Sequence, residues 1–223
     1  MAIYQLTEDP YLFPDPKLAS AAGLLAIGGD LTPERLITAY SLSFFPWYNP
    51  GEEILWWTPD PRLVLFPKDL KVSKSMRPYF NQNKFRVTFN QNFEDVIRNC
   101  KSNDRKGQTS GSWITNDITA AYSRLHDLGY VHSVEVWQDE ELVGGLYGIA
   151  LGKVFFGESM FAKVSNASKF GFISLVQKLQ AMNFTLIDCQ QETNHLKSMG
   201  AAPISREKFM TILEKNSFDR IEL

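Results

Sequence analysis

The chain has 223 residues, 44% of them hydrophobic and 22% charged, with a formal net charge of −2, which is the composition of an ordinary globular protein with a packed core. Its two cysteines show no disulfide or metal-ligand spacing, and no segment approaches the ~20 apolar residues of a membrane span. The first residues also lack the basic-then-apolar pattern of a signal peptide. These features argue against a disulfide-stabilised, membrane-spanning or secreted protein, and we expect a soluble protein of the cytoplasm.

The first sixty residues combine short elements with turns. Thr32-Pro33-Glu34 predicts the start of a helix, with Thr32 as its N-cap and Pro33 in the first helical position. An aromatic loop with two prolines follows at residues 44–51, and a short apolar run then ends in the proline-rich turn 58–61. We therefore predict a domain boundary there, with a small domain at residues 1–61 and a larger one at residues 62–223.

Basic residues gather in the segment 71–106, which carries nine Lys or Arg against three Asp or Glu in an otherwise acidic chain. We call this the basic segment, and its members are Lys71, Lys74, Arg77, Lys84, Arg86, Arg98, Lys101, Arg105 and Lys106. Such a segment can steer a polyanion toward the protein. It can equally be a solvated surface, and the residues alone leave both interpretations open.

The larger part of the chain predicts an α/β sheet with helices on its faces. Strands are expected at residues 132–137, 142–150, 154–161 and 184–188, the first three as a meander. One helix is expected to have Asn116 as its cap and to end at Gly129. Apolar residues at helical spacing predict a second helix around residues 172–179, and a third is expected at residues 206–215.

Two tryptophans lie in loops beside Pro or Gly, where core packing explains them poorly. Trp47 and Trp113 could each stack on an unpaired nucleotide base, which is worth ~1–3 kcal/mol per base. Each could instead fill space between two domains, and the two interpretations stay equally open. For Trp56 and Trp57 the space-filling interpretation is favoured.

Polar residues also occur where buried strands are expected. Glu158 interrupts the apolar strand 154–161, so it either points to solvent or faces a cleft where a cation or an amine arrives. Asp188 and Gln190 follow a buried strand, which is the usual ligand position of an open α/β sheet. Asp188 could instead cap the next helix. The chain has no phosphate-cradling motif, metal-ligand spacing or hydrolase elbow, so no metal and no cofactor is expected.

Seven short motifs follow one another along the chain. They are Phe45-Pro46-Trp47-Tyr48, Leu55-Trp56-Trp57-Thr58-Pro59-Asp60-Pro61-Arg62, Gly111-Ser112-Trp113-Ile114-Thr115, His132-Ser133-Val134-Glu135-Val136-Trp137, Leu142-Val143-Gly144-Gly145-Leu146-Tyr147-Gly148, Gly157-Glu158-Ser159-Met160-Phe161 and Leu186-Ile187-Asp188-Cys189-Gln190. Taken in order, these motifs resemble the leucyl/phenylalanyl-tRNA–protein transferases. The likeness covers about residues 24–202. This chain departs from the family in having Ser43 where a glycine often stands, and in its short C-terminal tail.

The resemblance implies an α/β (α+β) fold, in which an acyl-CoA N-acyltransferase-like C-terminal domain carries a small N-terminal α+β domain. It also implies transfer of Leu, Phe or Met from aminoacyl-tRNA to proteins that begin with Arg or Lys, which marks those proteins for degradation. The residues matching family positions are Trp47 and Trp113 for the terminal adenosine, Leu146, Phe155, Leu175 and Ile187 for an apolar side-chain pocket, and Glu158, Asp188 and Gln190 around the reacting groups. For tRNA contact we single out Lys71, Lys74, Arg77, Lys84 and Arg86 from the basic segment, and we expect a monomer.

The implied reaction agrees with these residue types. An aminoacyl ester is already activated, so the enzyme mainly positions a neutral amine against its carbonyl. The Gln190 amide cannot take a proton, so we expect its carbonyl to orient the amine while Asp188 fixes Gln190 and helps proton loss. Glu158 is expected to recognise the basic N-terminal residue of the acceptor. Two alternatives remain. One is an acyl-CoA-dependent N-acyltransferase, although the turn at residues 162–166 lacks the pyrophosphate-binding motif that is usual in those enzymes. The other is a non-catalytic tRNA-binding module.

Overall fold

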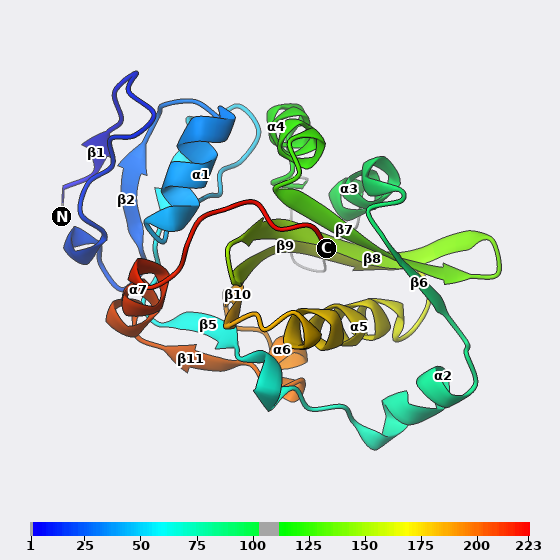
Figure 1. Cartoon of the computed structure of the whole chain (residues 1–223). Helices are drawn as coiled ribbons and strands as arrows, with labels where there is room; N and C mark the ends of the chain where they lie inside the picture. Colours follow the sequence, from blue (N-terminus) through cyan, green and yellow to red (C-terminus); the bar gives the residue numbers. More distant parts are fainter. Residues whose placement is uncertain (1, 103–111) are drawn as a thin grey trace.

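The computed structural model describes residues 2–102 and 112–223, and within them two β-sheets are surrounded by helices (Figure 1). The mixed α/β class expected from the sequence is confirmed. Arg105 and Lys106 of the basic segment, and Gly111 of the third motif, lie outside the described residues.

The smaller sheet is built from the N-terminal part of the chain. Its strand order is β1-β2-β4-β3, with β1 at Tyr4–Gln5, β2 at Leu24–Ile27, β3 at Phe45–Pro46 and β4 at Leu55–Trp57. Helix α1 (Pro33–Ser41) packs beside it and begins as predicted, because the Thr32 side chain accepts a hydrogen bond from the backbone N–H of Arg35. A short 3₁₀ helix, η1 (Pro16–Leu18), precedes β2.

The larger sheet has seven strands in the order β11-β5-β10-β9-β8-β7-β6. The strands are β5 (Arg62–Leu65), β6 (Arg86–Phe89), β7 (Val131–Gln138), β8 (Glu141–Leu151), β9 (Val154–Ala162), β10 (Leu186–Gln190) and β11 (Ala202–Ile204). The predicted meander is confirmed as β7–β8–β9. Strands β9 and β10 run parallel, whereas the other neighbouring pairs in the described sheet are antiparallel. Strand β10 begins two residues later than the predicted strand 184–188.

Helices cover both faces of the larger sheet (Figure 1). Helices α3 (Phe93–Ser102) and α4 (Asn116–Asp127) lie on one face, and α5 (Ala167–Ala181) lies on the other. Each face has its own hydrophobic core, and the core under α3 and α4 continues into the smaller sheet. The shorter helices are η2 (Pro67–Asp69), η3 (Lys74–Met76), α2 (Arg77–Asn81), α6 (Asn194–Ser198) and α7 (Arg206–Glu214).

The predicted cap of α4 is wrong by one residue. Thr115 is the N-cap, and its hydroxyl oxygen accepts the backbone N–H of Ile118 at 3.1 Å. Asn116 is the first helical residue, and its side-chain oxygen instead accepts a hydrogen bond from the Lys101 ammonium at 2.6 Å. Thr and Asn both suit an N-cap, so the local sequence does not distinguish between adjacent candidates.

Candidate active site

A cavity of about 450 Å³ opens where β8, β9, β10 and α5 meet the loop that follows β3. Of the nine residues that the resemblance assigns to substrate or reacting groups, eight line this cavity: Trp47, Trp113, Leu146, Phe155, Glu158, Ile187, Asp188 and Gln190. The fold therefore brings residues from position 47 to position 190 to one place.

The inner wall of the cavity is apolar. Leu146, Phe155 and Ile187 come from the three adjacent strands β8, β9 and β10, and none of them is more than 3% exposed. Helix α5 contributes Phe172, whereas Leu175 is fully buried and is not among the lining residues. Residues three apart share one face of a helix, so spacing alone cannot tell which of the two reaches the cavity.

Trp47 and Trp113 lie at the cavity with very different exposure. Trp47 is 36% exposed, whereas Trp113, in the loop before α4, is 7% exposed. The Trp57 indole N–H donates to the backbone oxygen of Trp47 at 2.7 Å, and the two rings lie 5.7 Å apart between centroids. Trp57 therefore supports the loop that presents Trp47. Trp56 is fully buried and donates its indole N–H to the Gly28 carbonyl.

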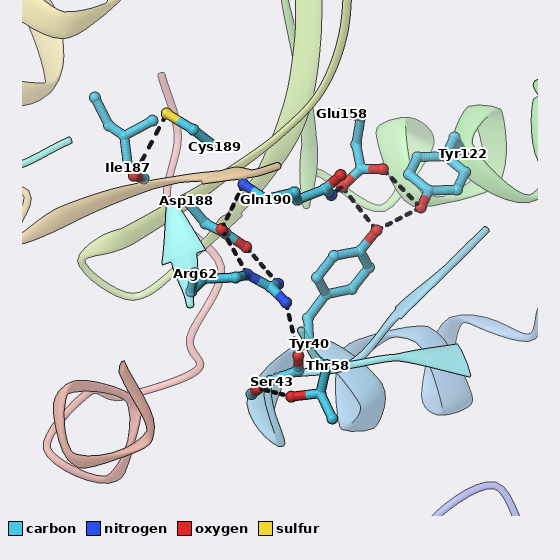
Figure 2. Close-up of polar contacts among 10 residues, drawn as sticks. All are labelled: Tyr40, Ser43, Thr58, Arg62, Tyr122, Glu158, Ile187, Asp188, Cys189 and Gln190. Carbon is cyan, nitrogen blue, oxygen red and sulfur yellow. Dashed lines mark hydrogen bonds and ion pairs between the residues drawn. The ribbon is translucent and has the colours of Figure 1, made fainter. Parts of the chain in front are cut away.

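The Asp188 carboxylate is held by a residue that the sequence analysis did not single out. Arg62 on β5 donates from Nε to Oδ1 at 2.9 Å and from Nη2 to Oδ2 at 2.7 Å, and both side chains are almost fully buried (Figure 2). The Arg62 guanidinium also lies over the Phe45 and Phe209 rings. In the sequence Arg62 is the last residue of the second motif and precedes a short apolar run, and neither feature indicates its partner.

Asp188 also shapes the end of β10. Its Oδ1 accepts the backbone N–H of Gln190 at 2.9 Å, where the pairing with β5 shifts register and Gln190 takes a φ of +58°. A positive φ is unfavourable for a residue with a side chain, so a buried side-chain hydrogen bond helps to hold this backbone. Asp188 does not cap the next helix, because Thr193 caps α6. With both oxygens bonded to Arg62, Asp188 is suited to positioning Gln190.

Glu158 faces the cavity rather than solvent, and it is only 8% exposed. Its Oε1 accepts hydrogen bonds from the Tyr40 hydroxyl at 2.7 Å and from Gln190 Nε2 at 3.1 Å, and its Oε2 accepts one from the Tyr122 hydroxyl at 3.2 Å (Figure 2). Burial raises the pKa of Glu158 to about 7, although the hydrogen bond from Tyr40 acts in the opposite direction. The carboxyl group can therefore take up and release a proton near neutral pH.

Other chemistries receive no support from the described residues. Burial raises the pKa of the Cys189 thiol well above its usual range, so this cysteine does not supply a thiolate nucleophile. Within residues 2–102 and 112–223, no three His, Cys, Asp or Glu side chains are grouped so that they could hold a metal ion. None of the helices in that part of the chain is long and apolar enough to cross a membrane.

The five residues singled out for tRNA contact are all exposed. Lys74, Arg77 and Arg86 lie on η3, α2 and β6, the last being the edge strand of the larger sheet, and Lys71 and Lys84 lie in the loops before η3 and before β6. The two remaining described members of the basic segment lie on α3, where Arg98 pairs with Asp95 and Lys101 binds Asn116.

These features define an α/β protein with an apolar binding pocket whose polar end is formed by convergent buried groups, which is the arrangement of an enzyme site. The family model described as Leucyl/phenylalanyl-tRNA protein transferase matches residues 64–214, and the model of that family's N-terminal domain matches residues 29–60. The chain belongs to the leucyl/phenylalanyl-tRNA–protein transferase family, as the resemblance indicated, and it is an aminoacyltransferase.

Two relatives that share more than half of the aligned residues with this chain agree with this assignment. The chain is 56% identical over 212 residues to the leucyl/phenylalanyl-tRNA–protein transferase of Flavobacterium johnsoniae, covering 95% of this chain and 99% of that protein. It is 53% identical over 216 residues to the one of Syntrophobacter fumaroxidans, covering 97% and 92%. Among solved structures, a GCN5-related N-acetyltransferase from Kribbella flavida matches with a TM-score of 0.36 at 11% identity, covering 81% of this chain and 63% of that one.

Proposed function

We propose that this protein moves Leu, Phe or Met from aminoacyl-tRNA to the N-terminal Arg or Lys of acceptor proteins and thereby creates a degradation signal. The observation that carries the proposal is one cavity with an apolar inner wall and a polar end made by Glu158, Asp188 and Gln190. An apolar pocket discriminates only ~1–3 kcal/mol per methylene, which suits acceptance of several apolar side chains.

In the proposed complex, the side chain of the transferred amino acid occupies the space between Leu146, Phe155 and Ile187. The terminal adenosine of the tRNA lies against Trp47 and Trp113, and the exposed indole of Trp47 supports this placement. The ester carbonyl then lies near Gln190. Because the Gln190 amide nitrogen donates to Glu158, its carbonyl oxygen is turned away from Glu158 and can accept a hydrogen bond from the attacking amine.

We also propose that the boundary between the two domains lies between residues 61 and 62. Strands β1–β4 lie before it and form one sheet, whereas β5–β11 lie after it and form the other, which supports two units. We also propose that the protein acts in the cytoplasm, because charged tRNA is present in that compartment. We propose further that it is a monomer and uses no cofactor.

A transfer assay with labelled leucyl-tRNA tests the function. Peptides that begin with Arg or Lys are expected to become labelled, whereas a matched Ala-started peptide and an N-acetylated Arg peptide are not. The same peptides are also incubated with an acyl-CoA as donor in place of leucyl-tRNA. Labelling only from acyl-CoA would support the CoA-dependent alternative, and tRNA binding without any transfer would support a binding module.

Neutralising three residues of the basic segment is expected to flatten the salt dependence of tRNA binding. Each phosphate contact contributes about −0.7 to −0.9 to the slope of log K against log salt, so losing three contacts reduces its steepness by about two to three. The variant changes Lys71, Lys74 and Arg77 to Gln, and the control changes the exposed Lys17, Lys208 and Lys215. Filter binding between about 50 and 200 mM salt measures the slope. Equal slopes in both triple variants would mean that these residues only solvate the surface.

A further inference from the structure

Two buried tyrosines surround the carboxylate of Glu158. Tyr40 comes from α1 and Tyr122 from α4, so segments far apart in the chain meet at this one group on β9 (Figure 2). Both tyrosines are fully buried. Their hydroxyl oxygens lie 2.5 Å from each other, 2.7 Å from Oε1 in the case of Tyr40, and 3.2 Å from Oε2 in the case of Tyr122.

Tyr40, Tyr122 and the Glu158 carboxylate form a closed ring of hydrogen-bonding contacts. Three oxygen–oxygen contacts join Tyr40, Tyr122 and the carboxylate, but the two hydroxyl groups supply only two hydrogens. When Glu158 is ionised, one contact therefore lacks a hydrogen. One added proton on Oε2 completes the ring, because Oε2–H donates to Tyr122, Tyr122 donates to Tyr40, and Tyr40 donates to Oε1. The ring can accept a proton without moving any heavy atom.

We propose that Tyr40 and Tyr122 are positioning residues that make Glu158 the acceptor of the proton lost by the attacking amine. Gln190 joins this ring to the reacting groups, because its Nε2 lies 3.1 Å from Glu158 Oε1. Gln190 and Glu158 both line the cavity, so an amine held by the Gln190 carbonyl lies at the same polar end of the cavity as Glu158. Asp188 does not compete for the proton, since Arg62 occupies both of its oxygens. The inference rests on the proposed function and assigns its proton-transfer step.

The amine lone pair forms the C–N bond at the ester carbonyl, and the C–O bond to the ribose breaks with its electron pair on the ribose oxygen. One amine proton passes to Glu158 and then to that ribose oxygen, which leaves as a hydroxyl. Glu158 ends as the carboxylate that it was at the start, so no other reactant is consumed.

Glu158 must be ionised to accept the proton, so the rate is expected to rise with pH as Glu158 ionises. Hydrogen bonds from both tyrosines lower the pKa of this buried carboxyl, and removing either hydroxyl should therefore move that rise to higher pH. The titratable and charged groups that face Glu158 are Tyr40 on α1, Arg62 on β5, Tyr122 on α4 and Asp188 on β10. The Asp188 charge raises this pKa and the Arg62 charge lowers it, and both stay in place in the tyrosine variants.

The test is the pH profile of kcat for transfer from leucyl-tRNA to an Arg-started peptide, in wild type, Tyr40→Phe, Tyr122→Phe and Glu158→Gln. Each Phe variant is expected to lose about tenfold at pH 7 and much less at pH 9, which matches the loss of one hydrogen bond to a charged group. Glu158→Gln is expected to lose about 10²-fold or more at every pH. The acceptor amine titrates identically in all variants, so differences between their profiles report Glu158.

A second measurement does not depend on activity. The Gln side chain imitates the protonated carboxyl, because its amide nitrogen can donate to Tyr122. Since the folded-state pKa of Glu158 lies near 7, above its ordinary value, wild-type stability should fall as the pH rises from about 5 to above 7. Glu158→Gln should show a smaller fall in melting temperature over that range. Tyr130→Phe, a half-buried tyrosine on the loop after α4, is the control and should match wild type in both measurements.

The outcomes separate this inference from the proposed function. If wild type transfers leucine but both Phe variants keep its pH profile, the proton assignment is wrong and the function stands. If the variants raise only KM for Arg-started peptides, Glu158 instead binds the basic side chain of the acceptor. If wild type transfers nothing from leucyl-tRNA, the proposed function itself fails. Should Tyr40→Phe not fold, Tyr122→Phe on a different helix tests the same point.

Discussion

Replacing Arg62 with methionine is expected to lower the free energy of unfolding by about 3–5 kcal/mol, because the variant leaves a buried carboxylate without its partner. In the native protein, Arg62 and Asp188 form a two-bond ion pair in which the side chains are 1% and 0% exposed. Methionine keeps most of the side-chain volume, so the decrease in the free energy of unfolding reports the loss of the Arg62 charge. Urea denaturation at pH 7 measures the change.

An exposed ion pair serves as the control. Lys197 and Glu192 also lie 2.7 Å apart, but their side chains are 42% and 48% exposed. Lys197→Met is therefore expected to cost at most about 1 kcal/mol. Adding Asp188→Asn to Arg62→Met should recover part of the loss, because a neutral amide is less costly to bury than a carboxylate. A loss for Arg62→Met no larger than that for Lys197→Met would contradict a stabilising role of the buried pair.

Replacing Gln190 with alanine is expected to lower the rate of the transfer step by about 10²-fold, since misplacing a reactant by about 1 Å costs that much. Binding of charged tRNA should be nearly unchanged, because Trp47, Trp113 and the basic segment are untouched. Single-turnover transfer to an Arg-started peptide and filter binding measure the two effects separately. Asp188→Ala should show the same pattern, accompanied by a loss of stability.

Glu192→Gln is the matched control for Gln190→Ala. Glu192 lies two residues further along the chain, is exposed and pairs with Lys197 rather than with the cavity. It should keep wild-type transfer. If Gln190→Ala weakened tRNA binding strongly and left turnover normal, the assignment of Gln190 to the reacting groups would be wrong.

Much of the fold could be predicted from local patterns. Alternation and helical spacing report which face of an element is buried, and they predicted the meander β7–β9 and the helices α1, α5 and α7. They were less accurate at the ends of elements, as the cap of α4 shows, because neighbouring residues can satisfy the same backbone groups.

The candidate site was only partly visible in the same patterns. The motifs contained the apolar residues Leu146 and Ile187, whereas Phe155 lies two residues before the sixth motif. In the structure the three residues come from the adjacent strands β8, β9 and β10. Alternation could not say whether Glu158 faced solvent or a cleft. The local sequence also left Asp188 as either a helix cap or a ligand-binding residue, since both uses are common at the end of a strand.

The sequence by itself determined the family, the order of the elements and which segments carry the candidate chemistry. Only the tertiary structure decided the partners of each polar group. Arg62 lies 126 residues from Asp188 in the chain, and Tyr40 lies 118 residues from Glu158. The physical reason is that a buried charge is stable only beside a matching donor or ion. Which donor that is depends on how the two sheets and α4 pack, and no local pattern records it.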